Sequence, residues 1–342
     1  MAKRAKSPLR SSSKPSSRFA AKPAAKRAST GPAFPRIASP KIASGELLTL
    51  LDFLRFAVSR FNEAKLVFAH GTTDPVAEAA FLISEALHLH PDQFESFASA
   101  RITALEAKKI LHLIEQRVRT RKPAAYLVNK IYMRGLPFYV DERVIVPRSF
   151  IGEILDTHFS GGEDGDPALL GDPFEVEHVL DLCTGSGCLA ILAARHFPNA
   201  QVDAVDVSKD ALAVAARNVA EHGLEDHVSL CHGDLFAPLT DATYDLIISN
   251  PPYVDAEGMA SLPPECRAEP KLAFDGGPDG LDLVRRILQE APAHLTPEGG
   301  LLCEIGRGRD NVEAAFPQLP LLWLDSEDSE AEVFWISAAD LA

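Results

Sequence analysis

The stretch that decides the fold is HVLDLCTGSGCLAILAARH, residues 178–196. It begins with an apolar run at 178–182, continues through a loop with glycines at 185 and 187, and ends in a helical pattern. A buried strand that turns tightly into a helix is the opening unit of an open α/β sheet, where ligands bind at the carboxyl ends of the strands. The loop therefore predicts a ligand site as well as a fold class.

The loop favours a nucleoside ligand over a dinucleotide. Glycine at 185 and 187 lets the backbone pass close to a ligand, because no Cβ stands in the way. The dinucleotide fingerprint G-x-G-x-x-G would need glycine at 183, 185 and 188, but 183 and 188 are cysteines. With no pyrophosphate to hold, the loop suits S-adenosyl-L-methionine; its expected cofactor-binding residues are Asp181, Thr184, Gly185, Ser186 and Gly187.

Strands and helices alternate after about residue 151. Strands are expected at 178–182, 201–207, 228–232, 244–249 and 300–305, with helices at 189–196, 209–222 and 281–293. Two further strands, 321–324 and 332–337, are joined by a short acidic turn and must run antiparallel. The pattern predicts an α/β, Rossmann-like parallel sheet closed by an antiparallel C-terminal hairpin, which is the methyltransferase variant of the fold.

Acidic residues lie at the ends of three successive expected strands. Asp206 can accept hydrogen bonds from both ribose hydroxyls, Asp234 can meet the adenine amino group, and Leu235 can cover the adenine face. Asp181 is close enough to favour the cationic methionine end. Each acid alone could be a helix cap or a solvated strand end. Their shared position beside a glycine-rich loop favours one cofactor site.

Asn250-Pro251-Pro252-Tyr253 ends the fourth expected strand, where the methyl group of the cofactor should lie. An amide nitrogen is a poor nucleophile, so two acceptors that take its two N–H hydrogens would orient it. The Asn250 side-chain oxygen and the Pro251 carbonyl can do so, and Tyr253 can stack on the flat amide. The alternative is a proline-rich turn. The motif serves any planar NH₂ group, whether adenine, guanine or glutamine.

The N-terminal half predicts two smaller units. Residues 46–122 show three helical segments, with an apolar face at Leu47, Leu50, Leu51, Leu54, Val58 and Phe61 in the first. Asp74-Pro75 should open the second helix, and the third should span 104–118. Residues 123–150 predict a β-hairpin connector, with strands at 125–128 and 138–140 around a turn at 134–137. The catalytic domain would then cover 151–342.

Charge is divided unevenly along the chain. Residues 1–45 hold eleven of the 34 Lys and Arg residues and none of the 48 acids, so they predict a disordered basic tail. The tail could be inert, could tether the protein electrostatically to an RNA-rich assembly, or could be an organellar transit peptide. The acidic body argues against a nucleic-acid enzyme. Five cysteines without paired spacing, and no apolar run of membrane length, predict a cytoplasmic protein with no metal.

With these residues in place, the chain resembles the HemK-like protein glutamine N5-methyltransferases over about residues 45–342. The resemblance is carried by segments 141–149, 181–188, 203–207, 250–255 and 280–288. Pro147-Arg148-Ser149-Phe150-Ile151 fits the branch that methylates the third protein of the large ribosomal subunit, because the release-factor branch has Pro-Arg-Pro-Glu-Thr there. Phe150 and Ala268 depart from the usual proline and histidine of this branch.

The resemblance implies a seven-stranded methyltransferase domain, a helical domain that helps select a protein substrate, and Arg148 near the cofactor. It implies methylation of a glutamine in that ribosomal protein, with residues 1–45 in contact with ribosomal RNA as a further expectation. Three alternatives remain open at this point: a release-factor methyltransferase, a nucleic-acid amino-group methyltransferase acting on adenine N6 or guanine N2, and a non-catalytic protein that keeps the fold.

Overall fold

The computed structural model describes residues 46–160, 168–327 and 329–342, all within one compact unit. The predicted basic tail, residues 1–45, lies outside the described residues, so its disorder and its three alternative roles stay predictions. Among the described residues, no helix is long and apolar enough to cross a membrane.

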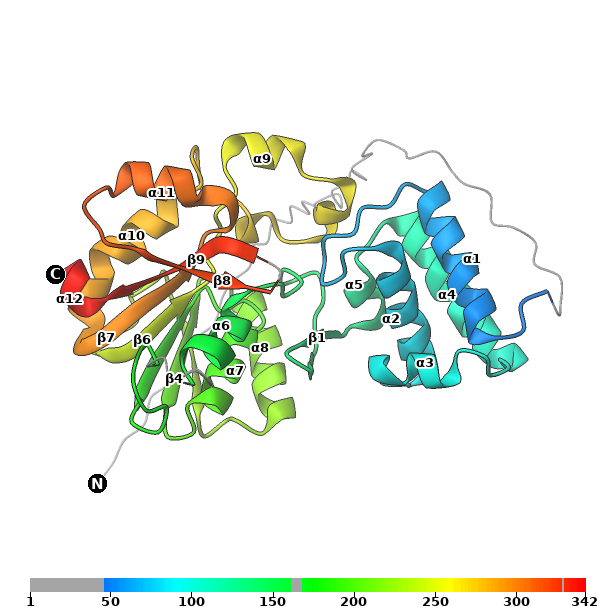
Figure 1. The fold of residues 1–342 in the computed structure, drawn as a ribbon, viewed down its shortest axis with the longest axis horizontal. Helices are drawn as coiled ribbons and strands as arrows, with labels where there is room; N and C mark the ends of the chain where they lie inside the picture. The colour runs from blue at the N-terminus through cyan, green and yellow to red at the C-terminus, as the bar shows by residue number, and fades with distance from the viewer. Residues whose placement is uncertain (1–45, 161–167, 328) are drawn as a thin grey trace, which may run out of the picture. The chain divides into compact units, whose positions relative to one another are not determined.

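The described residues form a seven-stranded sheet with the order β5-β4-β3-β6-β7-β9-β8 (Figure 1). Strands β3 to β7 pair in parallel, whereas β9 runs antiparallel to both β7 and β8. The predicted parallel sheet with an antiparallel C-terminal hairpin is therefore confirmed. The strands are β3 (His178–Leu182), β4 (Gln201–Asp206), β5 (Val228–His232), β6 (Tyr244–Ser249), β7 (Leu295–Glu304), β8 (Leu322–Ser326) and β9 (Ser329–Ser337).

Helices cover both faces of the sheet (Figure 1). On one face lie α6 (Ile151–His158), α7 (Cys188–His196) and α8 (Lys209–His222); on the other lie α10 (Asp282–Glu290) and α11 (Arg309–Ala315). Strand β6 shows the pleat that separates the two cores: Leu246 and Ile248 pack into the α6–α8 cluster, and Ile247 packs into the α10–α11 cluster. Because both faces are covered, the central part of β6 is apolar at consecutive positions rather than alternating. Helices α6 and α11 were not predicted.

The strand order reverses beside β3. The chain runs from β3 outward through β4 to β5, and then crosses back to place β6 on the opposite side of β3. Loops after β3 and β6 therefore diverge to opposite sides and leave a crevice at the carboxyl ends of these strands. Leu182 and Ser249 pair at this edge, immediately before the glycine-rich loop and the Asn250 motif.

The predicted three-helix segment is present as α1 (Leu50–Glu63), α2 (Pro75–Leu87) and α4 (Ala104–Thr120), with a short α3 (Phe94–Phe97). Helix α2 begins as expected, since the Asp74 side chain accepts hydrogen bonds from the backbone N–H groups of residues 76 and 77. The predicted face of α1 is partly wrong: Phe53 and Ala57 are buried, whereas Leu51 is 56% exposed. Because leucines occupy adjacent positions, the sequence of α1 is compatible with two overlapping apolar faces. Tertiary packing determines which of them is buried.

The connector differs from its prediction at 125–128. These residues belong to a short helix, α5 (Ala124–Val128), which ends at Asn129 with φ of 53°. The hairpin is shorter than expected and consists of β1 (Ile131–Met133) and β2 (Leu136–Phe138) around Arg134-Gly135. Both turn residues have positive φ, 49° and 75°, as a two-residue hairpin turn requires. The division into domains at 122 and 150 stays a prediction.

A fully buried ion pair holds α2 against α4. Arg117 Nε lies 2.7 Å from Glu78 Oε1, with both side chains 0% exposed, and Arg117 Nη2 donates to the Val67 carbonyl. Removing one member of a buried pair leaves the other charged and uncompensated, which usually destabilises a protein by about 3–5 kcal/mol. The pair therefore fixes the packing of the helical segment.

Replacing Arg117→Met should lower the free energy of unfolding by about 3–5 kcal/mol, because Glu78 would stay buried without its partner. Urea unfolding followed by far-ultraviolet circular dichroism measures this. Arg119→Met, a matched change two residues along α4 at an exposed position, should stay within about 0.5 kcal/mol of the parent. Equal stability of the two variants would contradict the role given to the Arg117 pair.

Candidate active site

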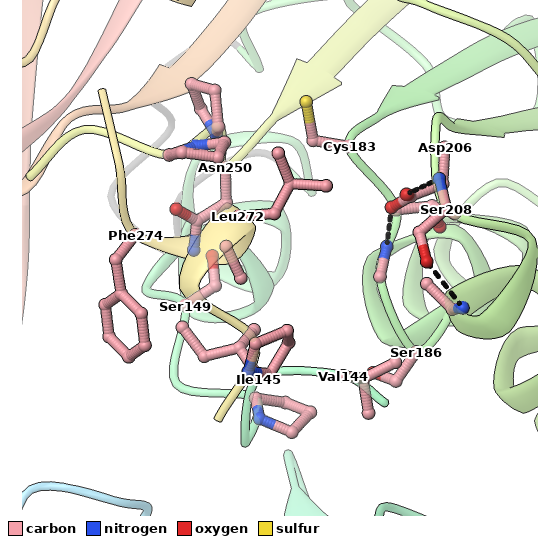
Figure 2. Close-up of a pocket in the computed structure, with 18 of the residues that line it drawn as sticks. Val144, Ile145, Ser149, Cys183, Ser186, Asp206, Ser208, Asn250, Leu272 and Phe274 are labelled. Carbon is pink, nitrogen blue, oxygen red and sulfur yellow. Dashed lines mark hydrogen bonds between the residues drawn. The ribbon is translucent and has the colours of Figure 1, made fainter. Parts of the chain in front are cut away.

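A cavity of about 570 Å³ opens at the carboxyl ends of β3 to β6 (Figure 2), a volume in the range of small-molecule sites. In Figure 2, Asp206 and Ser208 lie on one side of the cavity and Asn250, Leu272 and Phe274 lie on the other. The predicted site residues among its lining are Arg148, Thr184, Gly185, Ser186, Asp206, Asp234, Leu235, Asn250, Pro251, Pro252 and Tyr253. Segments far apart in the sequence thus meet where the strand order reverses.

The Asp206 carboxylate joins two of the loops around the cavity. Its Oδ2 accepts a hydrogen bond from Gly185 N at 2.9 Å, and its Oδ1 accepts one from Ser208 N at 2.8 Å (Figure 2). Burial raises the pKa of Asp206, against these two hydrogen bonds, which lower it. Each carboxylate oxygen retains a further lone pair, so Asp206 can still accept from a diol in the cavity.

Glycine is needed at 185 and at 187 for different physical reasons. Gly185 lines the cavity with φ of +57°, and an added Cβ there would meet only the Cys183 carbonyl, at 3.9 Å. Gly187 has φ of +80°, and an added Cβ would lie 3.1 Å from the Ala215 Cβ on α8. Gly185 therefore leaves room for a ligand, whereas Gly187 leaves room for a neighbouring helix.

Asp181 lies beneath the loop rather than among the residues that line the described cavity. It is fully buried, and its Oδ2 accepts from Thr184 Oγ1 at 2.5 Å and from Ala190 N at 3.1 Å. Burial raises the pKa of Asp181 to about 7. The structure thus gives Asp181 the role of fixing the loop to the start of α7, and its predicted effect on the methionine end stays a prediction.

The loop after β5 carries the two residues expected near adenine. Leu235 is buried with φ of 48° and lines the cavity. Asp234 also lines it, is exposed, and pairs with Arg286 Nη1 at 3.0 Å from α10. An exposed carboxylate that is already paired with an arginine attracts a distant charge only weakly. Asp234 would therefore contribute through a direct hydrogen bond to a ligand.

The Asn250 motif leaves β6 at the opposite side of the cavity from Asp206 (Figure 2). Asn250 Nδ2 donates to Glu304 Oε1 at 3.0 Å. The Tyr253 ring packs against Gly306, where an added Cβ would lie 2.6 Å from the ring. Burial raises the pKa of Tyr253, so its phenol is neutral at physiological pH. The structure brings the amide and the aromatic ring of the motif to the same cavity.

Arg148 reaches the cavity from the connector and is held there by Glu269. Its Nη1 and Nη2 lie 3.1 Å and 3.3 Å from the two Glu269 oxygens, and its guanidinium lies 5.6 Å from the centre of the Phe274 ring. Glu269 also accepts from Val146 N at 2.9 Å. Burial favours the neutral acid, but hydrogen bonds from His70 and Arg148 and their charges hold the pKa of Glu269 below its ordinary value.

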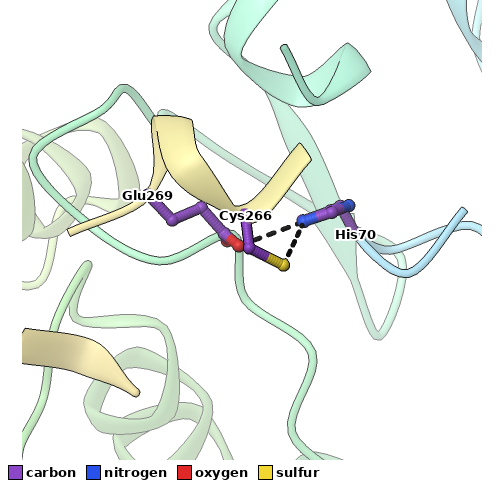
Figure 3. A group of neighbouring side chains, drawn as sticks. All are labelled: His70, Cys266 and Glu269. Atoms are coloured by element: carbon purple, nitrogen blue, oxygen red, sulfur yellow. Dashed lines mark hydrogen bonds and ion pairs between the residues drawn. The ribbon is translucent and has the colours of Figure 1, made fainter. Parts of the chain in front are cut away.

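His70, Cys266 and Glu269 form a buried group that joins the helical segment to the cavity wall (Figure 3). His70 Nε2 lies 3.0 Å from Glu269 Oε2 and 3.6 Å from Cys266 Sγ. These residue types can ligate a metal, but the His70–Glu269 distance is that of a hydrogen bond and Arg148 occupies both Glu269 oxygens. The geometry therefore favours an ion-pair cluster.

Two buried acids near the site were missed by sequence reasoning. Glu269 follows Ala268, one of the two departures from the branch pattern, but no signal in the sequence assigned its carboxylate a role. Glu304 did carry a signal, because it is the only charged residue in the apolar run Gly300–Ile305. A lone acid at the end of a buried strand rarely stays without partners, and Glu304 has three.

Comparison with known proteins gives concordant results. Residues 165–262 match the family model described as methyltransferase small domain. The chain is 75% identical over 319 residues to the ribosomal protein uL3 glutamine methyltransferase of Bradyrhizobium diazoefficiens, covering 93% of this chain and 99% of that protein. It is 51% identical to the Bordetella pertussis protein of the same name, over 86% of this chain and 97% of the other.

The Neisseria gonorrhoeae protein of this name is 50% identical over 87% of this chain and 97% of its own length. Three relatives thus match nearly end to end, and the matched region includes every loop that lines the cavity. The sheet order and the Asn250 motif agree with the resemblance inferred from the sequence. The chain belongs to the family of ribosomal protein uL3 glutamine methyltransferases.

Proposed function

We propose that the protein transfers a methyl group from S-adenosyl-L-methionine to the side-chain amide nitrogen of a glutamine in ribosomal protein uL3. The observation that carries this proposal is Asn250, placed at the cavity with its Nδ2 bound to Glu304, so that its Oδ1 is left to accept from a substrate amide. The substrate itself is the one that the names of the relatives state for those proteins.

The cavity residues fit the cofactor. Its methyl group is carried as an electrophile on a positively charged sulfur. Asp206 would accept from the ribose hydroxyls, Leu235 and Asp234 would bind adenine, and the loop 184–186 would follow the nucleoside, with Gly185 leaving room for it. Arg148 lies at the same cavity and is held by Glu269. Asp181 would act through the loop that it holds.

Asn250 and Pro251 would orient the glutamine amide. The Asn250 Oδ1 and the Pro251 carbonyl would each accept one N–H hydrogen, which directs the nitrogen lone pair toward the methyl group. Tyr253, neutral and packed on Gly306, would stack on the amide plane, and Pro252 would complete the wall. The nitrogen forms its bond to the methyl carbon as the sulfur–carbon bond breaks, and the proton leaves afterwards because the nitrogen has become positive.

The two departures from the branch pattern lie outside the cavity. Phe150 and Ala268 are partly buried and pack against the large core cluster, and neither is among the residues that line the described cavity. They therefore alter packing rather than the surface that a substrate would meet. The ribosomal-protein branch itself is supported by the relatives that carry this name.

Further parts of the proposal concern the N-terminal half. The helical segment 46–122 would help select the protein substrate, with 123–150 as connector and 151–342 as catalytic domain. The basic residues 1–45 would contact ribosomal RNA through charge, and the protein would act in the cytoplasm. Methylation measured with and without residues 1–45, across a range of salt concentrations, tests the RNA contact.

Asp206→Asn should weaken binding of S-adenosyl-L-methionine by about 10- to 100-fold, because a hydrogen bond to a charged acceptor contributes about 1.5–3 kcal/mol. Isothermal titration calorimetry measures the Kd. Asp210→Asn, the same change at an exposed position in the first turn of α8, should alter the Kd by no more than about 2-fold. If both variants bind like the parent, Asp206 has no role in holding the ribose.

Asn250→Ala should lower kcat by about 100- to 1,000-fold, the usual effect of removing one orienting group from a transition state. The Kd for the cofactor should change little, which separates orientation from binding. Asn199→Ala, at an exposed position after α7, serves as control and should keep full turnover. A fully active Asn250→Ala variant would refute the amide clamp.

The substrate is tested by incubating the enzyme with radiolabelled S-adenosyl-L-methionine and ribosomes from cells that lack it, followed by mass spectrometry. Label on a glutamine of uL3 is the expected result. Label on a release factor would keep the chemistry and overturn the branch, and label found solely in RNA would overturn the protein substrate.

A further inference from the structure

Glu304 sits at the end of β7, completely buried between the connector and the Asn250 motif. Three groups donate to it. Asn250 Nδ2 lies 3.0 Å from Oε1, while Ser149 Oγ and Phe150 N lie 2.6 Å and 2.9 Å from Oε2. The donors come from two segments about a hundred residues apart, and Glu304 joins them at the cavity wall.

The arrangement decides which way the Asn250 amide points. An asparagine side chain has an oxygen that accepts and a nitrogen that donates, and rotation by 180° exchanges them. An ionised carboxylate can accept but never donate. Only the Asn250 nitrogen can therefore face Glu304, and the Asn250 oxygen is left for the cavity.

We propose that Glu304 is a positioning residue, whose carboxylate holds the Asn250 amide with its oxygen toward the substrate. This rests on the proposed function, because the orientation matters only if Asn250 must accept a hydrogen bond from the glutamine amide. With the opposite orientation, an NH₂ group would face the substrate NH₂ group, and two donors cannot bond to each other.

Protonation of Glu304 would reverse the orientation of the Asn250 side-chain amide. Burial raises its pKa to about 7, as does the charge of Glu332 on β9, whereas the hydrogen bonds from Ser149 and Phe150 lower it. Oε2 already accepts from both the Ser149 hydroxyl and the Phe150 N–H, so a proton on Oε1, facing Asn250, is the placement that keeps both of these hydrogen bonds. The Asn250 oxygen must then turn to accept it. The Tyr253 phenol, also near Glu304, stays neutral across this range.

The carboxylate is the active form, so kcat should rise with pH through about 7 and fall by about tenfold per unit at pH values well below it. Glu332→Gln removes the neighbouring charge but leaves Glu304 and its three donors in place. It should move the midpoint of the pH profile to lower pH while keeping the maximal kcat. The substrate amide itself does not titrate in this range.

Glu304→Gln tests the orientation directly. Its oxygen will face Ser149 and Phe150, where two donors meet, and its nitrogen will face Asn250, which turns the Asn250 oxygen away from the substrate. The expected result is a loss in kcat of about 100-fold or more, with the cofactor Kd within about threefold of the parent and no pH dependence near 7.

The double variant Glu304→Gln with Asn250→Asp restores the pattern. The introduced aspartate can accept from the glutamine nitrogen with one oxygen and from the substrate with the other. Its kcat should exceed that of Glu304→Gln by about tenfold or more, although it carries one further change at the site. A merely structural role for Glu304 predicts the opposite, since the second substitution would add to the damage.

The outcomes separate this inference from the proposed function. If the parent enzyme leaves uL3 glutamine unmethylated, the proposed function fails. If Asn250→Ala is inactive but Glu304→Gln keeps the parent kcat and pH profile, the function stands and the positioning role is overturned. Thermal unfolding checks each variant, and should Glu304→Gln not fold, a parent kcat that does not fall at any acidic pH at which the enzyme stays folded overturns the inference by itself.

Discussion

Carboxylates that are buried or half-buried and accept from backbone N–H groups hold the loops around the cavity. Asp181 accepts from the start of α7, Asp206 from the loops after β3 and β4, Glu269 from the connector, and Glu304 from the residue before α6. Each such acid fixes a chain segment that has no strand or helix partner at that point. Because a buried carboxylate needs several donors to offset its desolvation, the loops cannot move independently of these acids.

The same acids give the cavity its electrostatic character. Burial raises the pKa of Asp181 and of Glu304 to about 7 and raises that of Asp206 as well, although hydrogen bonds to each of them oppose this shift. A cationic ligand relieves this, because an opposite charge nearby favours the ionised acid. Under the proposed function, a sulfonium cofactor would bring such an opposite charge to the cavity.

Much of the fold could be predicted from the sequence, because short apolar segments alternate with helical patterns; β5 and α8 agree residue for residue with expectation. Residues 125–128, predicted as a strand, belong to α5 because their packing, including the Tyr126 hydroxyl bound to the Val144 carbonyl, outweighed β-propensity. The motif residues of the site could be predicted from the sequence. The role of Glu269 could not, because its partners His70 and Arg148 are distant in sequence and only the fold brings them together.

Those distant partners bear on how a protein substrate is chosen. The motif Asn250-Pro251-Pro252-Tyr253 suits any planar NH₂ group, so discrimination must come from residues beyond it. Glu265 accepts from Val67 N and pairs with Arg121, while Glu269 pairs with His70 and with Arg148 at the cavity. A displacement of the helical segment would therefore reach Arg148 through one carboxylate. The proposed contact of the helical segment with a protein substrate would thus have a route to the cavity through Glu269.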